Sequence, residues 1–203
     1  MSNVLLLTSS PRGEASFSTQ VATELASKIA DARIVTRELW REPLSHILPA
    51  QIHAVYTPEE ARTAEQREAL AVSDTLIAEL KAADVVIVAA GMINFGIPST
   101  LKGWIDHVVR AGQTFRYGEA GPEGLVTGKK VVFVLSKGAV YSAGPMASFD
   151  HMEPYLRDTL GFLGMTDVET VVMEGSAFGS EAAEKALAGG RERAAGVAAA
   201  IGG

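Results

Sequence analysis

Four serines stand close together near the N-terminus, and hydroxyl groups at this density are suited to binding a phosphate. Ser9 and Ser10 follow the apolar run Val4–Leu7, and Ser16 and Ser18 precede a stretch with helical spacing. The first N–H groups of a helix are unpaired and its dipole attracts an anion, by about 0.3–1 kcal/mol. We therefore expect a single phosphate at this loop. The alternative is that the serines only cap the helix and form turns.

The serine loop lacks the glycine patterns of the common nucleotide-binding motifs. It does not contain G-x-G-x-x-G, and G-x-x-x-x-G-K-[ST] occurs nowhere in the chain. The segment Thr127–Lys130 has a Gly-Lys pair but neither the earlier glycine nor the following Ser or Thr. The close approach of a pyrophosphate to the backbone is therefore not expected, and neither is nucleotide hydrolysis.

Two further loops follow apolar runs and complete the candidate site. Val85–Ala90 leads into Met92–Phe95, and Lys130–Leu135 leads into Ser136–Ala139. Continuously apolar runs of this length are typical of strands covered on both faces in a parallel sheet. In such an open sheet the ligand lies outside the carboxyl ends of the strands, where the strand order reverses. The loops after the first, third and fourth strands are therefore expected to meet around one ligand.

Five expected strands alternate with helices. The strands are Val4–Leu7, Arg33–Leu39, Val85–Ala90, Lys130–Leu135 and Val168–Met173, and the helices begin near Ser18, at Thr57 or Thr63, after Ser99, near Leu156 and at Ser180. This alternation predicts an α/β fold with right-handed crossovers and helices on both faces of a parallel sheet. An irregular excursion between Trp40 and Thr63 and a polar, glycine-rich connection over 112–128 interrupt it. With 203 residues, we expect one domain, 1–203.

The composition excludes several classes of function. The net charge of −6 makes nucleic acid and anionic lipid poor partners, and the absence of cysteine excludes disulfides and thiolate chemistry. The longest apolar run, 85–93, is about half the ~20 residues of a membrane span, and the N-terminus lacks the pattern of a signal peptide. The four histidines lack metal-ligand spacing, so no metal site is expected. We expect a cytoplasmic protein.

Several of these segments resemble the FMN-dependent NADH azoreductase and quinone reductase family. They are Met92–Ser99 with Leu101 and Lys102, Ala111–Leu125, and Thr127–Lys130, and the likeness extends from Val4 to about Gly179. The resemblance implies a flavodoxin-like, doubly wound five-stranded parallel sheet of order 2-1-3-4-5. It also implies a homodimer with one FMN per subunit, NADH or NADPH as hydride donor, and quinones or azo compounds as acceptors.

Carried over by position, the resemblance assigns roles to the three loops. It implies that Ser10, Ser16, Phe17 and Ser18 hold the phosphate, that Met92, Ile93, Asn94 and Phe95 line the isoalloxazine ring, and that Ser136, Lys137, Gly138 and Ala139 approach its pyrimidine side. The chain departs from the family where Gly91, Ile93, Lys137 and Ala139 replace the usual Pro, Tyr, Arg and Gly. Main-chain contacts to a flavin survive such changes, whereas the surroundings of the ring are altered.

The resulting hypothesis is an FMN-dependent oxidoreductase that transfers two electrons by a ping-pong mechanism. Because flavin N5 carries the hydride, no catalytic side chain is required. One alternative is a flavodoxin-type electron carrier without small-molecule turnover, and another is a flavin-free protein that binds a different phosphate ester. The four aromatic residues Phe115, Tyr117, Phe149 and Phe162 could wall a slot over the flavin. An exposed apolar face that includes Trp104 would support dimerisation.

Overall fold

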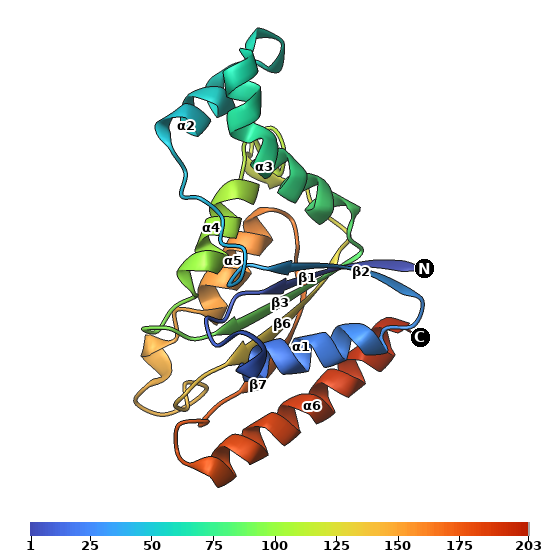
Figure 1. The fold of residues 1–203 in the computed structure, drawn as a ribbon, viewed down its shortest axis with the longest axis vertical. Coiled ribbons are helices and arrows are strands. Elements are labelled where there is room, and N and C mark those ends of the chain that lie inside the picture. The colour runs from blue at the N-terminus through green and yellow to red at the C-terminus, as the bar shows by residue number, and fades with distance from the viewer. Residues whose placement is uncertain (203) are drawn as a thin grey trace.

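The computed structural model describes residues 1–202 and alternates strands with helices along most of the chain (Figure 1). The main elements are β1 (Ser2–Thr8), α1 (Phe17–Lys28), β2 (Ala32–Glu38), α2 (Pro49–Tyr56), α3 (Ala64–Ala82), β3 (Val85–Gly91), α4 (Ser99–Val108), β4 (Phe115–Gly118), β5 (Gly121–Gly124), β6 (Lys130–Ser136), α5 (Glu153–Phe162), β7 (Asp167–Met173) and α6 (Ser180–Gly202). Three short 3₁₀ turns, η1 (Gly13–Ala15), η2 (Glu59–Ala61) and η3 (Ala147–Phe149), lie between them.

The five long strands form one parallel sheet in the order β2-β1-β3-β6-β7. Counted within this sheet alone, that is the predicted order 2-1-3-4-5. The strand order reverses between β1 and β3, because the chain runs outward from β1 to β2 and then from β3 to β7. In the register of these strands, Thr8 lies opposite Ala89 and Gly91 lies opposite Ser136. The loops after β1, β3 and β6 therefore open at one edge of the sheet.

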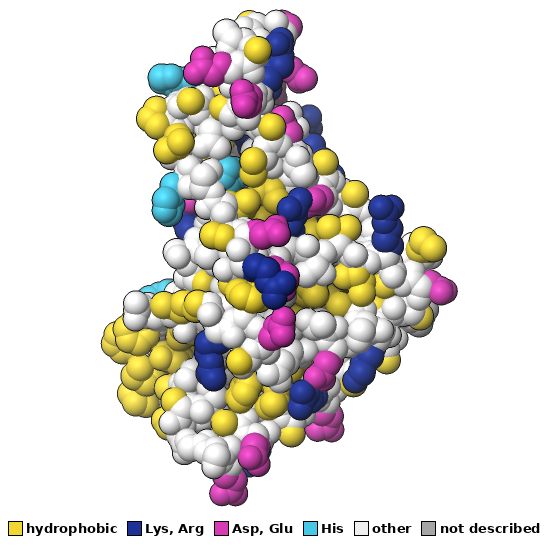
Figure 2. Space-filling model, viewed as in Figure 1, with side chains coloured by type: hydrophobic (Ala, Val, Ile, Leu, Met, Phe, Trp, Pro, Cys, Tyr) yellow, Lys and Arg dark blue, Asp and Glu magenta, His cyan; other side chains and the backbone are white. Residues whose placement is uncertain are grey.

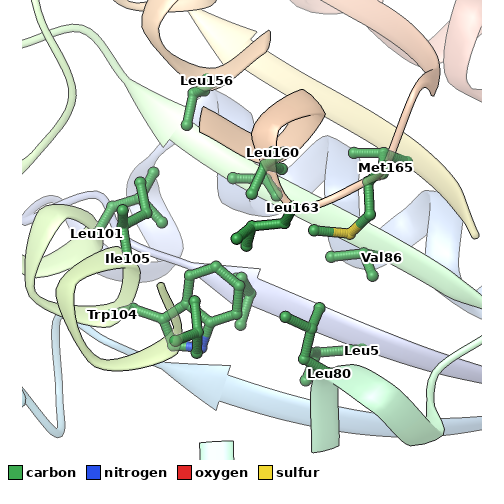
Figure 3. Packing of buried hydrophobic residues seen from close by; sticks show 14 of the residues in the cluster. Leu5, Leu80, Val86, Leu101, Trp104, Ile105, Leu156, Leu160, Leu163 and Met165 are labelled. Carbon is green, nitrogen blue, oxygen red and sulfur yellow. The ribbon is translucent and has the colours of Figure 1, made fainter. Parts of the chain in front are cut away.

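Side chains of alternate residues in the central strands enter two separate cores. Leu5 and Leu7 belong to a core shared with α3, α4 and α5, whereas Val4 and Leu6 belong to one shared with α1 and α6. Figure 3 shows side chains from α4 and α5 gathered near Leu5 in the first of these cores. Figure 1 shows α1 and α6 together on one side of the sheet. Each leucine buried in this way contributes about 1.5–3 kcal/mol.

The excursion between Trp40 and Thr63 is more ordered than the sequence suggested, because it contains α2. Pro49 occupies the first position of this helix, where proline has no N–H to leave unpaired and its φ suits a helix. The side chain of Gln51 accepts a hydrogen bond from the N–H of Leu48 at 2.8 Å and closes the first turn. The expectation of an irregular segment was wrong here because this proline starts a helix.

The polar connection over residues 112–128 was also misread, because it forms an antiparallel hairpin of β4 and β5. Its strands are four residues long and mostly exposed, so they carry no apolar alternation for sequence analysis to detect. Gly124 lets the hairpin lie directly on the end of α5. A Cβ at this position would stand 2.2 Å from the backbone nitrogen of Gly164.

Trp104 does not form part of an exposed apolar face. Its side chain is 1% exposed and packs in the core between the sheet and α4 (Figure 3). The suggested support for a dimer from this residue was therefore wrong. Within residues 1–202, no helix is both long enough and apolar enough to cross a bilayer.

Candidate functional site

The first serines of the loop after β1 differ in their roles. Ser9 is tied to the neighbouring strand, because both its N–H and its hydroxyl donate to the carbonyl oxygen of Ala89, at 3.1 and 2.8 Å. Ser10 is buried, and its hydroxyl oxygen is 3.4 Å from the N–H of Arg12. Gly13, with a φ of +55°, lets the loop pass the ring of Trp40, which would lie 3.0 Å from an added Cβ. Ser9 thus holds the loop to the sheet, and Ser10 remains available to a ligand.

Ser16 and Ser18 form a buried pair of hydroxyl groups at the start of α1. Their side-chain oxygens lie 3.0 Å apart. Ser16 is the residue that precedes the helix, yet its side chain makes no capping hydrogen bond. A hydroxyl can both donate one hydrogen bond and accept two, so the pair retains capacity for a ligand. This geometry disfavours the alternative in which Ser16 serves only as a cap.

The loop after β3 is a tight turn with unusual backbone angles. The N–H groups of Ile93 and Gly96 each donate to the other's carbonyl oxygen at 3.0 Å. The two residues between them, Asn94 and Phe95, have positive φ angles of 47° and 71°. Asparagine tolerates this region, but phenylalanine rarely adopts it, and glycine is usual at the second position of such turns. A bulky residue held there indicates a functional constraint on the turn.

The loop after β6 is supported by the loop after β7. The N–H of Lys137 donates to Met173 at 2.8 Å, and the N–H of Ala177 donates to Gly138 at 2.9 Å. The hydroxyl of Ser176 donates to the carbonyl oxygen of Lys137 at 3.2 Å. The backbone of residues 137–139 is therefore fixed before any ligand binds.

The side chain of Lys137 is buried in an ion cluster. Its Nζ lies 2.6 Å from Oδ2 of Asp150 and 3.5 Å from Oε1 of Glu174, and the lysine side chain is 2% exposed. Burial opposes ionisation of Asp150. The hydrogen bond and charge of Lys137, with the N–H groups of Glu153 and Met152, outweigh that effect and lower the pKa of this carboxyl.

A cavity of about 290 Å³ lies among these loops, close to the lower end of the size range of ligand pockets. Eight of the predicted site residues line it, namely Ser10, Ser16, Phe17, Met92, Ile93, Ser136, Lys137 and Gly138. A second cavity of about 500 Å³ is lined by Ile93 and Asn94 together with His151 and Tyr155. The remaining predicted residues, Ser18, Phe95 and Ala139, line neither cavity.

Five residues that sequence analysis did not assign also line the smaller cavity: Pro11, Arg12, Gly91, Ser176 and Ala177. Pro11 and Arg12 lie inside the serine loop, so the sequence could have indicated that they belong to the site. Arg12 is an exposed cation at the edge of this cavity. Ser176 and Ala177 follow β7, and the rule that points to the reversal of strand order gave no reason to select that loop.

The aromatic residues of the predicted slot fall into two separate groups. Phe149 packs against Phe95 with ring centres 5.2 Å apart, near the candidate site. Phe115 instead packs against Phe162 at 4.7 Å and Tyr117 at 5.5 Å. The four residues therefore do not form one wall within a single chain. Figure 2 shows apolar side chains gathered at the carboxyl end of the sheet, where the exposed apolar residues include Phe95, Val140 and Phe149.

Comparison with known proteins identifies the family. The family model for the flavodoxin-like fold matches residues 2–197. The chain belongs to the flavodoxin-like fold family. It is 54% identical to FMN-dependent NADH:quinone oxidoreductase 1 of Rhizobium etli, over 95% of this chain and 96% of that protein. It is 53% identical to an FMN-dependent NADH:quinone oxidoreductase of Agrobacterium fabrum, over 93% and 94%. The resemblance found in the sequence is thereby confirmed.

A solved azoreductase structure is similar over nearly the whole chain. The azoreductase from Bacillus anthracis str. Sterne superimposes with a TM-score of 0.89 at 31% identity, and the match covers 98% of this chain and 99% of that chain. In flavodoxin-like sheets of this order, the ligand lies outside the carboxyl ends of β1 and β3, where the strand order reverses. The smaller cavity occupies that position, since it is lined by the loops that follow β1 and β3.

Within residues 1–202, no three acidic or histidine side chains are grouped so as to hold a metal ion. His151 lies beside the flavodoxin-like site, and its backbone N–H donates to the carbonyl oxygen of Phe95 at 3.0 Å. Its side chain is exposed and lines the larger cavity next to Asn94.

Proposed function

We propose that this chain is an FMN-dependent oxidoreductase that takes a hydride from NADH or NADPH and reduces quinones and azo compounds. The observation that carries the proposal is the cavity between the loops that follow β1 and β3, which is lined by Ser16, whose hydroxyl contacts that of the buried Ser18. The names of relatives that are 53–54% identical along nearly the whole chain support the same cofactor, and they favour NADH as the donor.

The residues of the three loops fit the chemical parts of FMN. The phosphate needs hydrogen-bond donors, and Ser10, Ser16 and Ser18 offer hydroxyls beside the first N–H groups of α1, with Phe17 between the two buried serines. Among the hydrogen bonds of residues 1–202, none uses the N–H of Asn94 or Phe95. These amides are available to the polar edge of the flavin ring, while Met92 and Ile93 supply apolar contact.

The loop after β6 offers a second set of donors. The N–H groups of Gly138 and Ala139 also take part in no hydrogen bond among the described residues, whereas the hydroxyl of Ser136 lies near the cavity. We assign Ser136 to Ala139 to the pyrimidine side of the ring. Lys137 lines the cavity, and its ammonium is held in the ion cluster with Asp150 and Glu174.

When bound, FMN supplies the redox chemistry, because its N5 position accepts a hydride and passes two electrons on. The chain's own task is to hold the phosphate, orient the ring with main-chain amides and exclude water from its apolar side. Donor and acceptor then use one slot in turn, which gives ping-pong kinetics. We further propose that the protein is a single flavodoxin-like domain that acts as a homodimer in the cytoplasm. Sedimentation as a monomer would contradict the dimer.

The test is to purify the protein and record its absorption spectrum. We expect yellow protein with flavin bands, and steady-state oxidation of NADH with menadione or a benzoquinone as acceptor. Protein that is colourless and cannot be reconstituted with FMN would overturn the proposal. FMN-loaded protein without turnover of small quinones would instead indicate the electron carrier, and native mass spectrometry would reveal a different phosphate ester.

A further inference from the structure

Lys137 is a buried cation, and the proposed function gives its side chain no direct role. Its ammonium is surrounded by two carboxylates, Asp150 at 2.6 Å and Glu174 at 3.5 Å, which are themselves 14% and 13% exposed. A buried ammonium is tolerated only when it is paired and hydrogen-bonded. The cluster is therefore an energetically demanding arrangement, and what it holds in place is informative.

The two carboxylates are located at opposite ends of the segment 140–150. Glu174, which follows β7, contacts its start, and Asp150 is its last residue. Glu174 accepts hydrogen bonds from the N–H groups of Tyr141 and Ser142, at 2.9 and 3.3 Å. Asp150 accepts from the N–H groups of Met152 and Glu153, at 3.1 and 3.3 Å, and so fixes the start of α5. A single ammonium thus links the beginning of the segment, through Glu174, to its end, through Asp150.

This segment brings two aromatic rings onto the strained turn of the candidate site. Phe149 packs on Phe95 with ring centres 5.2 Å apart, and Tyr141 meets Phe95 edge-on at 6.4 Å. We call these three residues the aromatic wall. Phe95 and Phe149 remain 39% and 44% exposed, so the wall offers ring surface that no described residue covers. Phe95, the central residue of the wall, directly follows Asn94, which lines the 500 Å³ cavity.

We propose that Lys137 is a positioning residue that, through Asp150 and Glu174, holds the aromatic wall and thereby sets the preference for large, flat acceptors. The inference rests on the proposed oxidoreductase function. A two-ring acceptor such as a naphthoquinone presents more surface to the wall than a single-ring benzoquinone does. Aromatic pairs of this kind change affinity by about twofold to tenfold beyond their buried area. The wall therefore favours the larger acceptor by a similar factor.

The first experiment measures kcat/KM of the FMN-loaded protein for menadione and for 1,4-benzoquinone. Lys137→Met should lower the ratio of the two values by about threefold to tenfold, mainly through a higher KM for menadione. Lys137→Arg should restore the ratio to within about twofold of the wild type. The charge is kept, and a cavity of about 900 Å³ beside the cluster has room for the longer side chain. Lys185→Met is the matched control, since it removes an exposed lysine that lines the same cavity.

The second experiment reads the position of the segment without any turnover. Amide hydrogen exchange at residues 141–153 should be at least tenfold faster in Lys137→Met than in the wild type, and unchanged in Lys185→Met. Equal protection in Lys137→Met would show that the ammonium does not hold the segment, and would overturn the proposal.

A third variant keeps the test decisive if Lys137→Met does not fold. Phe149→Ala alters a half-exposed ring, so the fold should persist. It should lower the menadione-to-benzoquinone ratio by about twofold to tenfold while exchange at Tyr141 and Ser142 stays slow. A ratio equal to that of the wild type would overturn the role of the wall. Wild-type protein that reduces neither quinone would count against the proposed function, whereas hydrogen exchange would still decide the role of Lys137.

Discussion

The side-chain oxygens of Ser16 and Ser18 lie 3.0 Å apart at the start of α1, and both residues are buried. Ser16 is in the capping position but does not cap the helix. Two buried hydroxyl groups bonded mainly to each other are underused, because each can make further hydrogen bonds. A phosphate at the helix N-terminus would use this remaining capacity and would also interact favourably with the helix dipole.

Replacing both residues, Ser16→Ala with Ser18→Ala, should weaken FMN binding by tenfold or more. A hydrogen bond to a charged group is worth about 1.5–3 kcal/mol, and about 1.4 kcal/mol corresponds to a factor of ten. Quenching of flavin fluorescence during titration of the apoprotein gives the Kd. Ser27→Ala is the control on the same helix, since its hydroxyl donates only to the carbonyl oxygen of Glu24. Equal affinity in the double variant would show that the phosphate binds elsewhere.

At position 95, we expect glycine to be more stabilising than alanine. Both Phe95→Gly and Phe95→Ala remove the ring, but the φ of +71° suits only glycine. An L-residue pays about 1–2 kcal/mol in the left-handed region, and the greater freedom of glycine in the unfolded chain offsets part of this. Phe95→Gly should therefore exceed Phe95→Ala by about 0.5–1 kcal/mol in the free energy of unfolding, measured with urea. The reverse order would contradict a left-handed conformation at this residue.

The pairing of Asp150 with Lys137 predicts a pH dependence of stability. Because the pKa of Asp150 is lowered in the folded protein, its ionised form stabilises the fold above the unfolded pKa of about 3.9. That contribution is lost as the pH falls through the folded pKa. Asp150→Asn should thus cost about 1.5–3 kcal/mol at pH 7, the value of a hydrogen bond to a charged group. The difference in free energy of unfolding between Asp150→Asn and the wild type should shrink below about pH 4. A constant difference between pH 7 and pH 3 would contradict the pairing.

Much of this fold follows from local patterns, and the exceptions have physical causes. The unbroken apolar run of Val85–Ala90 is typical of a strand covered on both faces, and β3 is buried along these residues. Two capping patterns left the start of α3 open between Thr57 and Thr63. The structure selects Thr63, whose hydroxyl accepts from the N–H of Gln66 at 3.2 Å, while the Gln66 side chain accepts in return at 3.0 Å.

The candidate site was predictable where topology fixes it and not where distant side chains decide. Three loops were found because parallel strands bring their carboxyl ends to one edge. The direction of the Lys137 side chain could not be predicted from the sequence. Its partner Asp150 lies 13 residues further along the chain and forms no local pattern with it. The hairpin of β4 and β5 was missed for a similar reason, since its contacts are with the end of α5.

Gly124 marks the closest approach of that hairpin to α5, and it should not tolerate a side chain. Gly124→Ala would place a Cβ 2.2 Å from the backbone nitrogen of Gly164, so backbone must move. Overpacking of this kind costs about 1–3 kcal/mol or more in the free energy of unfolding. Gly118→Ala, in the same hairpin, should cost much less because its nearest neighbour would be at 3.6 Å. Similar urea midpoints for the two variants would show that β5 does not pack against α5 as described.

Removal of FMN should lower stability by an amount set by its affinity. A ligand that binds only the folded state contributes about 2.7 kcal/mol when present at 100 times its Kd. Unfolding of wild-type apoprotein should therefore shift to lower urea concentration and return when FMN is added. If the serines bind the phosphate, adding FMN should raise the free energy of unfolding of the Ser16→Ala, Ser18→Ala variant less than that of the wild type. At the same FMN concentration, the increase should be about 1.4 kcal/mol smaller for each tenfold loss of affinity. Its apoprotein provides the internal reference, so a stability defect of the variant itself cancels. An equal gain for both proteins would mean that FMN is held without these two hydroxyl groups.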